Sequence, residues 1–96
     1  MGHKAEKPKR LAKKLLQIRE ALGLSQNGLV NHLGLTGQLS QGKISEFETG
    51  RREPSLLVLL RYARATGVSM DVLVDDELDL PERLPATTRK ESRKRS

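Results

Sequence analysis

The chain has 96 residues, of which 31% are charged, with a formal charge of +6 and no cysteine. This length allows one small domain with tails and is too short for a catalytic domain beside a ligand-sensing domain. The absence of cysteine excludes a disulfide framework and a zinc finger. No apolar run is long enough to span a membrane and none resembles a secretion signal, so we expect a cytoplasmic protein.

The positive charge is concentrated at the two ends. Residues 1–22 carry seven basic and two acidic residues, and residues 87–96 carry five and one. Residues 23–86 are net negative, with six basic and nine acidic residues. We therefore expect a flexible basic arm over 1–7, a domain over 8–80 and a flexible basic tail over 81–96. Basic tails suit a polyanionic partner, although such runs are often simply solvated.

The first predicted helix begins at Pro8, because proline suits the first helical position, and ends at Gly23. Its apolar residues recur at the spacing of one helical face. They are Leu11, Leu15, Ile18 and Leu22.

Two short helices with serine N-caps follow. Ser25 precedes a helix from about Gln26 to Leu33 that Gly34 stops, and Ser40 precedes one over 41–49 that Gly50 stops. Their inward-facing residues are expected to be Leu29, Val30, Leu33, Ile44 and Phe47. Two short helices with a tight entry to each suggest a helix-turn-helix.

A fourth helix is predicted after the N-cap Ser55 and ends at Gly67, and Ser69 caps a short fifth helix with Met70 and Leu73 inward. The core-facing residues of the fourth helix are expected to be Leu56, Leu59, Leu60 and Ala63. An acidic strip follows, made of Asp75, Asp76, Glu77, Asp79 and Glu82. DNA would repel this strip, so it should lie away from a DNA-binding face.

Two stretches, Leu22-Gly-Leu-Ser-Gln26 and Ile44-Ser-Glu-Phe-Glu-Thr-Gly50, resemble the helix-turn-helix of the Cro and phage-repressor (XRE-like) family. The resemblance continues through Pro54-Ser-Leu56 and Gly67-Val-Ser-Met-Asp71. It implies an all-α, compact five-helix lambda-repressor-like domain. It also implies a sequence-specific regulator that binds double-stranded DNA and is associated with the nucleoid.

The helix over 41–49 divides into an apolar and a polar face, as entry into the major groove requires. The candidate base-reading residues are Gln41, Gly42, Lys43, Ser45 and Glu46. Gln41 could bond adenine N6 and N7, and Glu46 could accept from cytosine N4. The alternative is that these polar residues are only a solvated surface. The position of Gln41, which matches the family's leading base-reading glutamine, favours recognition.

The resemblance also assigns supporting residues. Gln26 matches a glutamine that touches phosphate and supports the base-reading glutamine, and Asn27 is a lesser phosphate candidate. Arg51 and Arg52 follow the turn where the family approaches the DNA backbone again. Arg19 and Glu48 match a pair that forms an internal salt bridge in many relatives.

One departure from the family lies in the turn between Leu33 and Ile44. Lengthening this turn by about four residues costs little loop-closure entropy, so the fold should survive while the position of the reading helix is less secure. Leu35 and Leu39 are expected to hold the longer turn down, and Thr36 or Gln38 could contact the DNA backbone.

Other functions fit less well. Gly37 to Lys43 fits the first seven positions of a phosphate-binding loop, but Ile44 replaces the magnesium-binding hydroxyl and no strand precedes it. We therefore expect no enzyme activity, no cofactor and no metal.

An antitoxin or adaptor of the same fold, with a toxin or the transcription machinery as partner, remains an alternative. Leu57, Val58 and Val72 are excess apolar residues that are either extra core or, as we favour, a homodimer interface on an inverted repeat.

Overall fold

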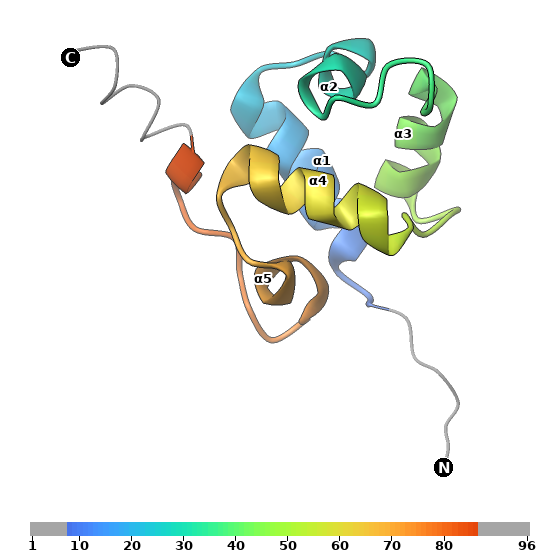
Figure 1. Cartoon of the computed structure of the whole chain (residues 1–96). Coiled ribbons are helices and arrows are strands. Elements are labelled where there is room, and N and C mark those ends of the chain that lie inside the picture. The colour runs from blue at the N-terminus through green and yellow to red at the C-terminus, as the bar shows by residue number, and fades with distance from the viewer. Residues whose placement is uncertain (1–7, 87–96) are drawn as a thin grey trace, which may run out of the picture.

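The computed structural model describes residues 8–86, and within that range it contains helices and no strand. The helices are α1 (Leu11–Leu22), α2 (Gln26–His32), α3 (Gln41–Thr49), α4 (Leu56–Thr66) and α5 (Met70–Val74). In Figure 1, α4 crosses in front of α1, with α2 above, α3 to the right and α5 below. The all-α, five-helix prediction is confirmed. The arm over 1–7 and the part of the tail over 87–96 lie outside the described residues.

Local sequence signals set most helix ends. The N-cap predictions at Ser25, Ser40, Ser55 and Ser69 are confirmed. Each serine hydroxyl accepts a hydrogen bond, 2.9 to 3.2 Å long, from a backbone N–H of the first helical turn. At the other end of α3, Gly50 adopts a left-handed φ of 82°, which glycine tolerates without strain. The bounds of α3 are therefore as predicted.

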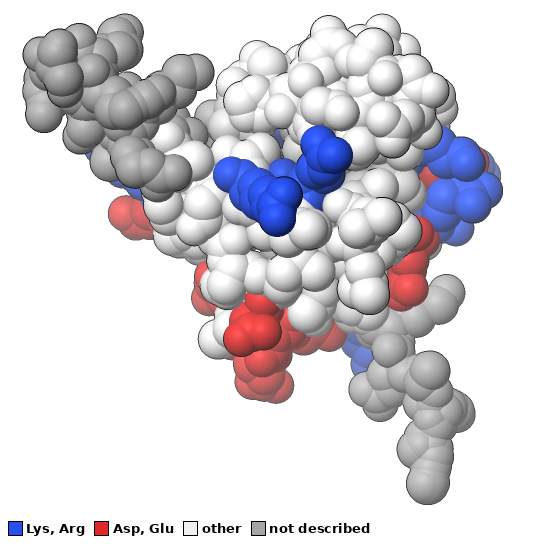
Figure 2. All heavy atoms as spheres, viewed as in Figure 1, with Lys and Arg blue, Asp and Glu red and all other residues white. Residues whose placement is uncertain are grey.

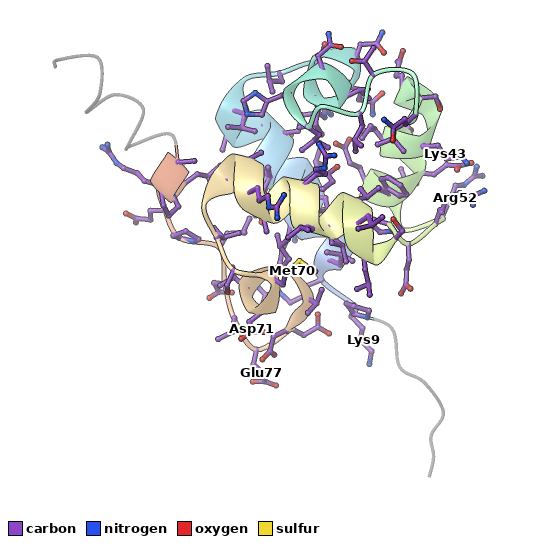
Figure 3. All side chains as sticks on the ribbon, viewed as in Figure 1. Lys9, Lys43, Arg52, Met70, Asp71 and Glu77 are labelled. Carbon is purple, nitrogen blue, oxygen red and sulfur yellow. The ribbon has the colours of Figure 1, made fainter. Side chains whose placement is uncertain are left out.

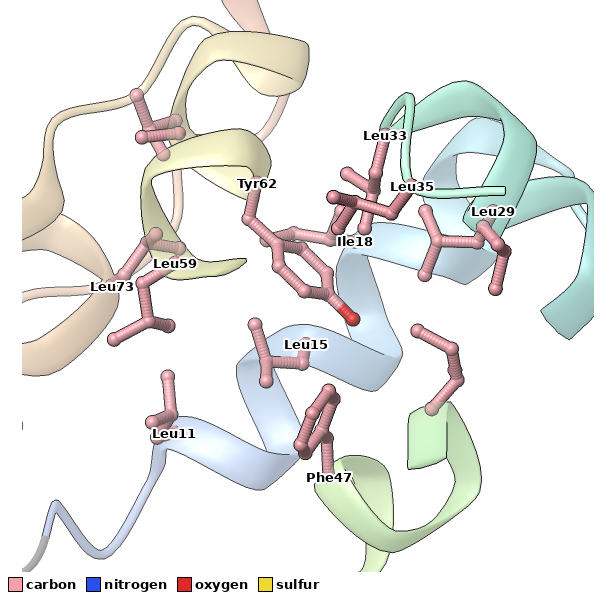
Figure 4. Close-up of a cluster of buried hydrophobic side chains, with 14 of the residues drawn as sticks. Leu11, Leu15, Ile18, Leu29, Leu33, Leu35, Phe47, Leu59, Tyr62 and Leu73 are labelled. Atoms are coloured by element: carbon pink, nitrogen blue, oxygen red, sulfur yellow. The ribbon is translucent and has the colours of Figure 1, made fainter. Parts of the chain in front are cut away.

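The core lies between α1 and the other four helices (Figure 4). Its fully buried side chains include Leu15, Ile18, Ile44 and Tyr62, and Phe47 is 4% exposed. Phe47 is thus a core residue, as expected, and Tyr62 is one as well. The Tyr62 hydroxyl has no hydrogen-bond partner within the described residues, and burial raises the pKa of this side chain.

Helix α1 begins at Leu11 and not at Pro8, so the predicted start is wrong by about one turn. The reason is a contact from the far end of the domain. The Asp76 carboxylate accepts hydrogen bonds of 2.9 Å from the backbone N–H groups of both Lys9 and Arg10. These N–H groups belong to the entry of α1, where a carboxylate also interacts favourably with the helix dipole.

A side chain of α1, that of Lys14, in turn contacts the end of α5. Its side chain is 1% exposed, and its ammonium donates to the carbonyl oxygens of Val72 (2.7 Å) and Asp75 (2.9 Å) at the end of α5. A cation is favourable at a helix C-terminus, where carbonyl groups are left without intrahelical partners. Desolvation lowers the pKa of Lys14. Helices α1 and α5 therefore cap each other, which attaches the short α5 to the domain.

The hydrogen bonds of the Asp76 carboxylate at the entry to α1 should make the stability of the fold depend on pH. The backbone N–H groups of Lys9 and Arg10 lower the pKa of Asp76 below its ordinary value. A depressed carboxylate pKa stabilises the fold above the unfolded-state value, about pH 4, and the contribution is lost as pH falls through the folded value. We expect Asp76→Asn to be less stable than the wild type near neutral pH and to lose less stability on acidification. Thermal melts from about pH 6 to pH 2 measure this. Parallel losses in both proteins would contradict it.

The first turn of α4 differs from its prediction. Leu56 was expected in the core but is 74% exposed, whereas Leu59 and Ala63 are buried and Leu60 is half-buried. The chain enters α4 through Pro54, which is buried beside Leu11 and Phe47. The buried residue at the entry to α4 is therefore Pro54, and Leu56 at the first helical position faces outward.

The lengthened turn is ordered by its own leucines. Helix α2 ends at His32, with Leu33 as its cap, one residue earlier than predicted. Leu35 is 7% exposed, and Leu39 packs against the core, so the prediction that they hold the turn down is confirmed. The Arg61 guanidinium of α4 donates to the Leu33 carbonyl at 3.1 Å, which fixes the start of the turn.

The segment after α5 also packs on the domain. Leu84 is 5% exposed and belongs to the core. A Cβ atom at Gly67 would lie 2.8 Å from the Ala86 nitrogen, so the close approach of this segment to α4 requires glycine there. Residues 81–86 of the expected tail are therefore held against the helices.

Candidate nucleic-acid interface

The first turn of α3 presents a polar, accessible surface. Gln41, Gly42 and Lys43 are exposed, while Ser45 and Glu46 are half-buried along its sides. Ile44 and Phe47 on the opposite face are buried, which anchors the helix to α1. The structure thus brings together the five residues predicted to read bases on one short helix whose position is set by its apolar face.

A chain of hydrogen-bonded side chains connects the polar surface of α3 to α1 and α2. The Arg19 Nε atom lies 2.8 Å from Glu48 Oε2, and Glu48 Oε1 accepts from Gln26 Nε2 at 3.2 Å. Gln26 Oε1 then accepts from Gln41 Nε2 at 3.3 Å. The Glu48 side chain is only 5% exposed and that of Arg19 is 20% exposed. This line of contacts orients the Gln41 amide before any ligand arrives.

Arg19 also contacts the turn between α1 and α2. Its Nη1 atom donates to the Leu24 carbonyl at 3.0 Å, in the turn between α1 and α2. The hydrogen bonds that the Arg19 guanidinium donates to the Glu48 carboxylate raise the pKa of Arg19. One guanidinium therefore ties three elements together: its own helix α1, the entry to α2 and, through Glu48, the end of α3.

Glu46 and Arg52 form an ion pair that the sequence patterns did not predict. Arg52 Nε lies 2.8 Å from Glu46 Oε1, and this contact lowers the pKa of Glu46. Glu46 is consequently held as an ionised hydrogen-bond acceptor. Arg52 was expected to contact phosphate, and only part of its guanidinium is used in this pair. Arg51 is exposed beside it on the turn that follows α3.

Gly42 has no internal requirement for glycine. Its φ is not positive. Apart from its chain neighbours and the backbone of α3, the one described atom within 4 Å of a Cβ built on it is the Ser40 hydroxyl at 3.7 Å, an ordinary contact. Glycine inside a helix costs about 1 kcal/mol relative to alanine. The missing side chain leaves the backbone of α3 open to close approach from outside.

Charged side chains are unevenly distributed over the surface. Figure 2 shows basic atoms in the middle of the face and at the edge near α3, with some acidic atoms below the latter, and a further acidic group at the α5 end. Figure 3 labels Lys43 and Arg52 at the edge near α3 and Asp71 and Glu77 at the α5 end. Two residues of the acidic strip, Asp76 and Asp79, contact Arg10 at the entry to α1. The strip lies away from the exposed surface of α3, as expected.

The remaining candidates occupy different surroundings. Gln26 is half-buried between α3 and Glu48, and Asn27 is exposed at the start of α2. Of the dimer candidates, Leu57 is 73% exposed, whereas Val58 and Val72 pack partly against the core. His32 is exposed. In residues 8–86 no group of three or more histidine, aspartate or glutamate side chains could hold a metal ion.

Sequence reasoning missed the two arginines of α4. Arg61 and Arg64 are exposed on one face of this helix, beside the lengthened turn. Their spacing of three residues places them on one face, which was the signal available in the sequence.

Two short helices, joined by an ordered turn and braced by three more, define a helix-turn-helix domain. The chain belongs to a family described as "Helix-turn-helix domain", which matches residues 10–76. This match supports a DNA-binding domain and is consistent with the resemblance to the XRE-like family. Searches of curated proteins and of solved structures found no match to this chain. In residues 8–86 no helix has the length and apolar character needed to cross a membrane.

Proposed function

We propose that the protein is a sequence-specific, double-stranded DNA-binding transcriptional regulator that places α3 in the major groove. The observation that carries the proposal is the Gln41 amide, exposed at the start of α3 and held by Gln26. An exposed glutamine usually loses side-chain entropy when it binds, and this contact reduces that loss. A cytoplasmic, nucleoid-associated location follows from a DNA partner.

Each residue of the surface has a role in this proposal. Gln41 pairs with adenine N6 and N7, and the ionised Glu46 accepts from cytosine N4. Lys43 and Ser45 reach neighbouring base edges or phosphates. The residues that position the domain on the DNA backbone are Gln26, Asn27, Arg51 and Arg52. Their phosphate contacts set register without reading sequence.

The proposal includes a homodimer on an inverted repeat. A helix of nine residues reads few base pairs, and two-fold symmetry doubles the length of sequence that is read. The two half-sites would lie one helical turn, about 34 Å, apart.

Selection of bound duplexes from a random DNA pool tests this function. We expect an enriched inverted repeat, and competition with random duplex should weaken binding to it much less than competition with the same repeat. Equal binding to all duplexes would refute the specific regulator. The exposed Leu56 and Leu57 favour a second candidate, an adaptor or antitoxin that binds a protein partner. That candidate predicts a protein complex and no enriched DNA sequence.

Gly42→Ala separates recognition from stability. Alanine should raise the free energy of unfolding by roughly 0.5–1 kcal/mol, because the site has room for a Cβ atom and alanine favours helix. The same methyl group should weaken binding to the selected duplex, since it lies where the backbone would approach the bases. Thermal melting and DNA titration measure the two effects. A more stable variant with unchanged DNA affinity would contradict the role given to Gly42.

A further inference from the structure

A shallow groove runs between α4 and the lengthened turn before α3. It encloses about 330 Å³. Its apolar side chains include Leu39, Leu57, Val58 and Leu60. Leu57 is 73% exposed and its neighbour Leu56 is 74% exposed, although both are large apolar side chains. An apolar surface of this kind, rimmed by polar groups, is typical of an interaction site.

Two arginines give the groove a positive rim. Arg61 lines it while its Nη1 atom donates to the Leu33 carbonyl at 3.1 Å, which leaves the rest of its guanidinium available. Arg64 lines it one turn further along α4 and forms no ion pair within residues 8–86. Among residues 8–86, no acidic residue lines the groove. An occupant should therefore carry apolar side chains flanked by carboxylates.

The same chain carries a segment with that chemistry, the acidic turn over 75–79. Leu78 is 39% exposed and is, with Leu56 and Leu57, one of three exposed large apolar residues in the described part of the chain. Acidic residues flank it on both sides. The turn is ordered, because the Asp75 carboxylate accepts from the Glu77 N–H at 2.9 Å. Glu77 is exposed and forms no ion pair with another described residue.

The two features lie on one face. In Figure 2 the basic side chains of α4 occupy the middle of the face in view and the acidic end of α5 lies below them. Helix α3 lies at the side of this face (Figure 1). A two-fold axis that points toward α3 therefore exchanges the basic and acidic regions, as a self-complementary interface requires. It also leaves the α3 helices of both copies on the same side.

We propose that this face is the dimer interface, in which the groove of each copy receives the acidic turn of a second copy. Leu78 enters beside Leu57, and Glu77 faces Arg64 across the two-fold axis. The inference rests on the homodimer in the proposed function and adds its surface and its pairing. It also explains why Leu57 is exposed while Val58 and Val72 already pack against their own core.

Charge reversal tests the pairing by sedimentation equilibrium without DNA. We expect a wild-type dimer, and we expect Arg64→Glu and Glu77→Arg each to raise its dissociation constant by roughly tenfold or more, since like charges then meet. An equimolar mixture of the two variants should restore the dimer mass, because each contact in the mixed dimer again joins opposite charges. The double variant should dimerise for the same reason.

Matched reversals on the exposed face of α1, Lys13→Glu and Glu20→Arg, should leave the dissociation constant unchanged. Circular dichroism melts confirm that each variant is folded. A wild-type monomer at all concentrations, single variants that remain dimeric, or a mixture that stays monomeric would each overturn the interface.

The DNA selection experiment tests recognition independently of the interface. A monomer that still enriches one half-site would retain the proposed recognition, whereas a dimer without sequence preference would refute recognition and leave the interface standing.

Discussion

Glu48→Gln should lower the free energy of unfolding by about 3 kcal/mol, the lower end of the range for removing one partner of a buried ion pair. The Glu48 side chain is 5% exposed and that of Arg19 is 20% exposed, so the substitution leaves a largely buried positive charge without its counter-ion. The lower end applies because Arg19 retains some contact with solvent. In a domain of this size, 1 kcal/mol shifts the melting temperature by roughly 4–8 °C, so the decrease should exceed 10 °C.

Two further variants test whether the unpaired Arg19 charge causes the loss of stability in Glu48→Gln. Glu53→Gln removes an exposed carboxylate just after α3 and should leave the melting temperature unchanged. Replacing both partners, as Arg19→Met with Glu48→Met, should be less damaging than Glu48→Gln alone, because no buried charge is then left unpaired. An unchanged melting temperature in Glu48→Gln would show that the pair does not support the fold.

Gln41→Ala should reduce affinity for the selected duplex by roughly 5- to 150-fold, the equivalent of one bidentate base contact worth about 1–3 kcal/mol. The loss should be largest for the duplex with adenine at the contacted position and small for duplexes altered there. Gln41 is exposed and, within the part of the chain that the structure describes, its side chain hydrogen-bonds only to Gln26, so stability should change little. Fluorescence anisotropy on matched and single-base-altered duplexes measures the discrimination.

Gln26→Ala should act in the same direction with a smaller effect, since it removes the acceptor that orients Gln41 and one phosphate contact. Gln17→Ala on the exposed side of α1 serves as the matched control and should not change affinity. Equal affinity loss on every duplex would make Gln41 a backbone contact and not a base reader.

The sequence predicted those parts of the fold that depend on neighbouring residues. A serine hydroxyl caps the helix that begins beside it, and a glycine such as Gly50 ends the helix that precedes it, so the ends of α3 were readable within a few residues. The packing of Leu35 and Leu39 against the core followed from their apolar character in an otherwise polar turn. These signals are local and need no knowledge of the rest of the chain.

The errors arose where distant segments meet. Nothing near Pro8 indicates that Asp76 takes up the N–H groups at the entry to α1, and nothing near Leu56 shows that Pro54 is the buried residue at the entry to α4. In the candidate nucleic-acid interface, too, the local features were predictable and the contacts between separate segments were not. The faces of α3 followed from helical periodicity, but the pairing of Glu46 with Arg52 depends on the path of the chain after Gly50.

The mutual capping of α1 and α5 has a consequence for the order in which the chain folds. Its hydrogen bonds join residues 58 to 67 positions apart, and contacts over such distances close late because a long loop must be ordered first. Helices α2 and α3 contact each other over a much shorter stretch of chain. During synthesis the helix-turn-helix would therefore assemble first, and the entry to the first helix would stay open until Asp76 has left the ribosome.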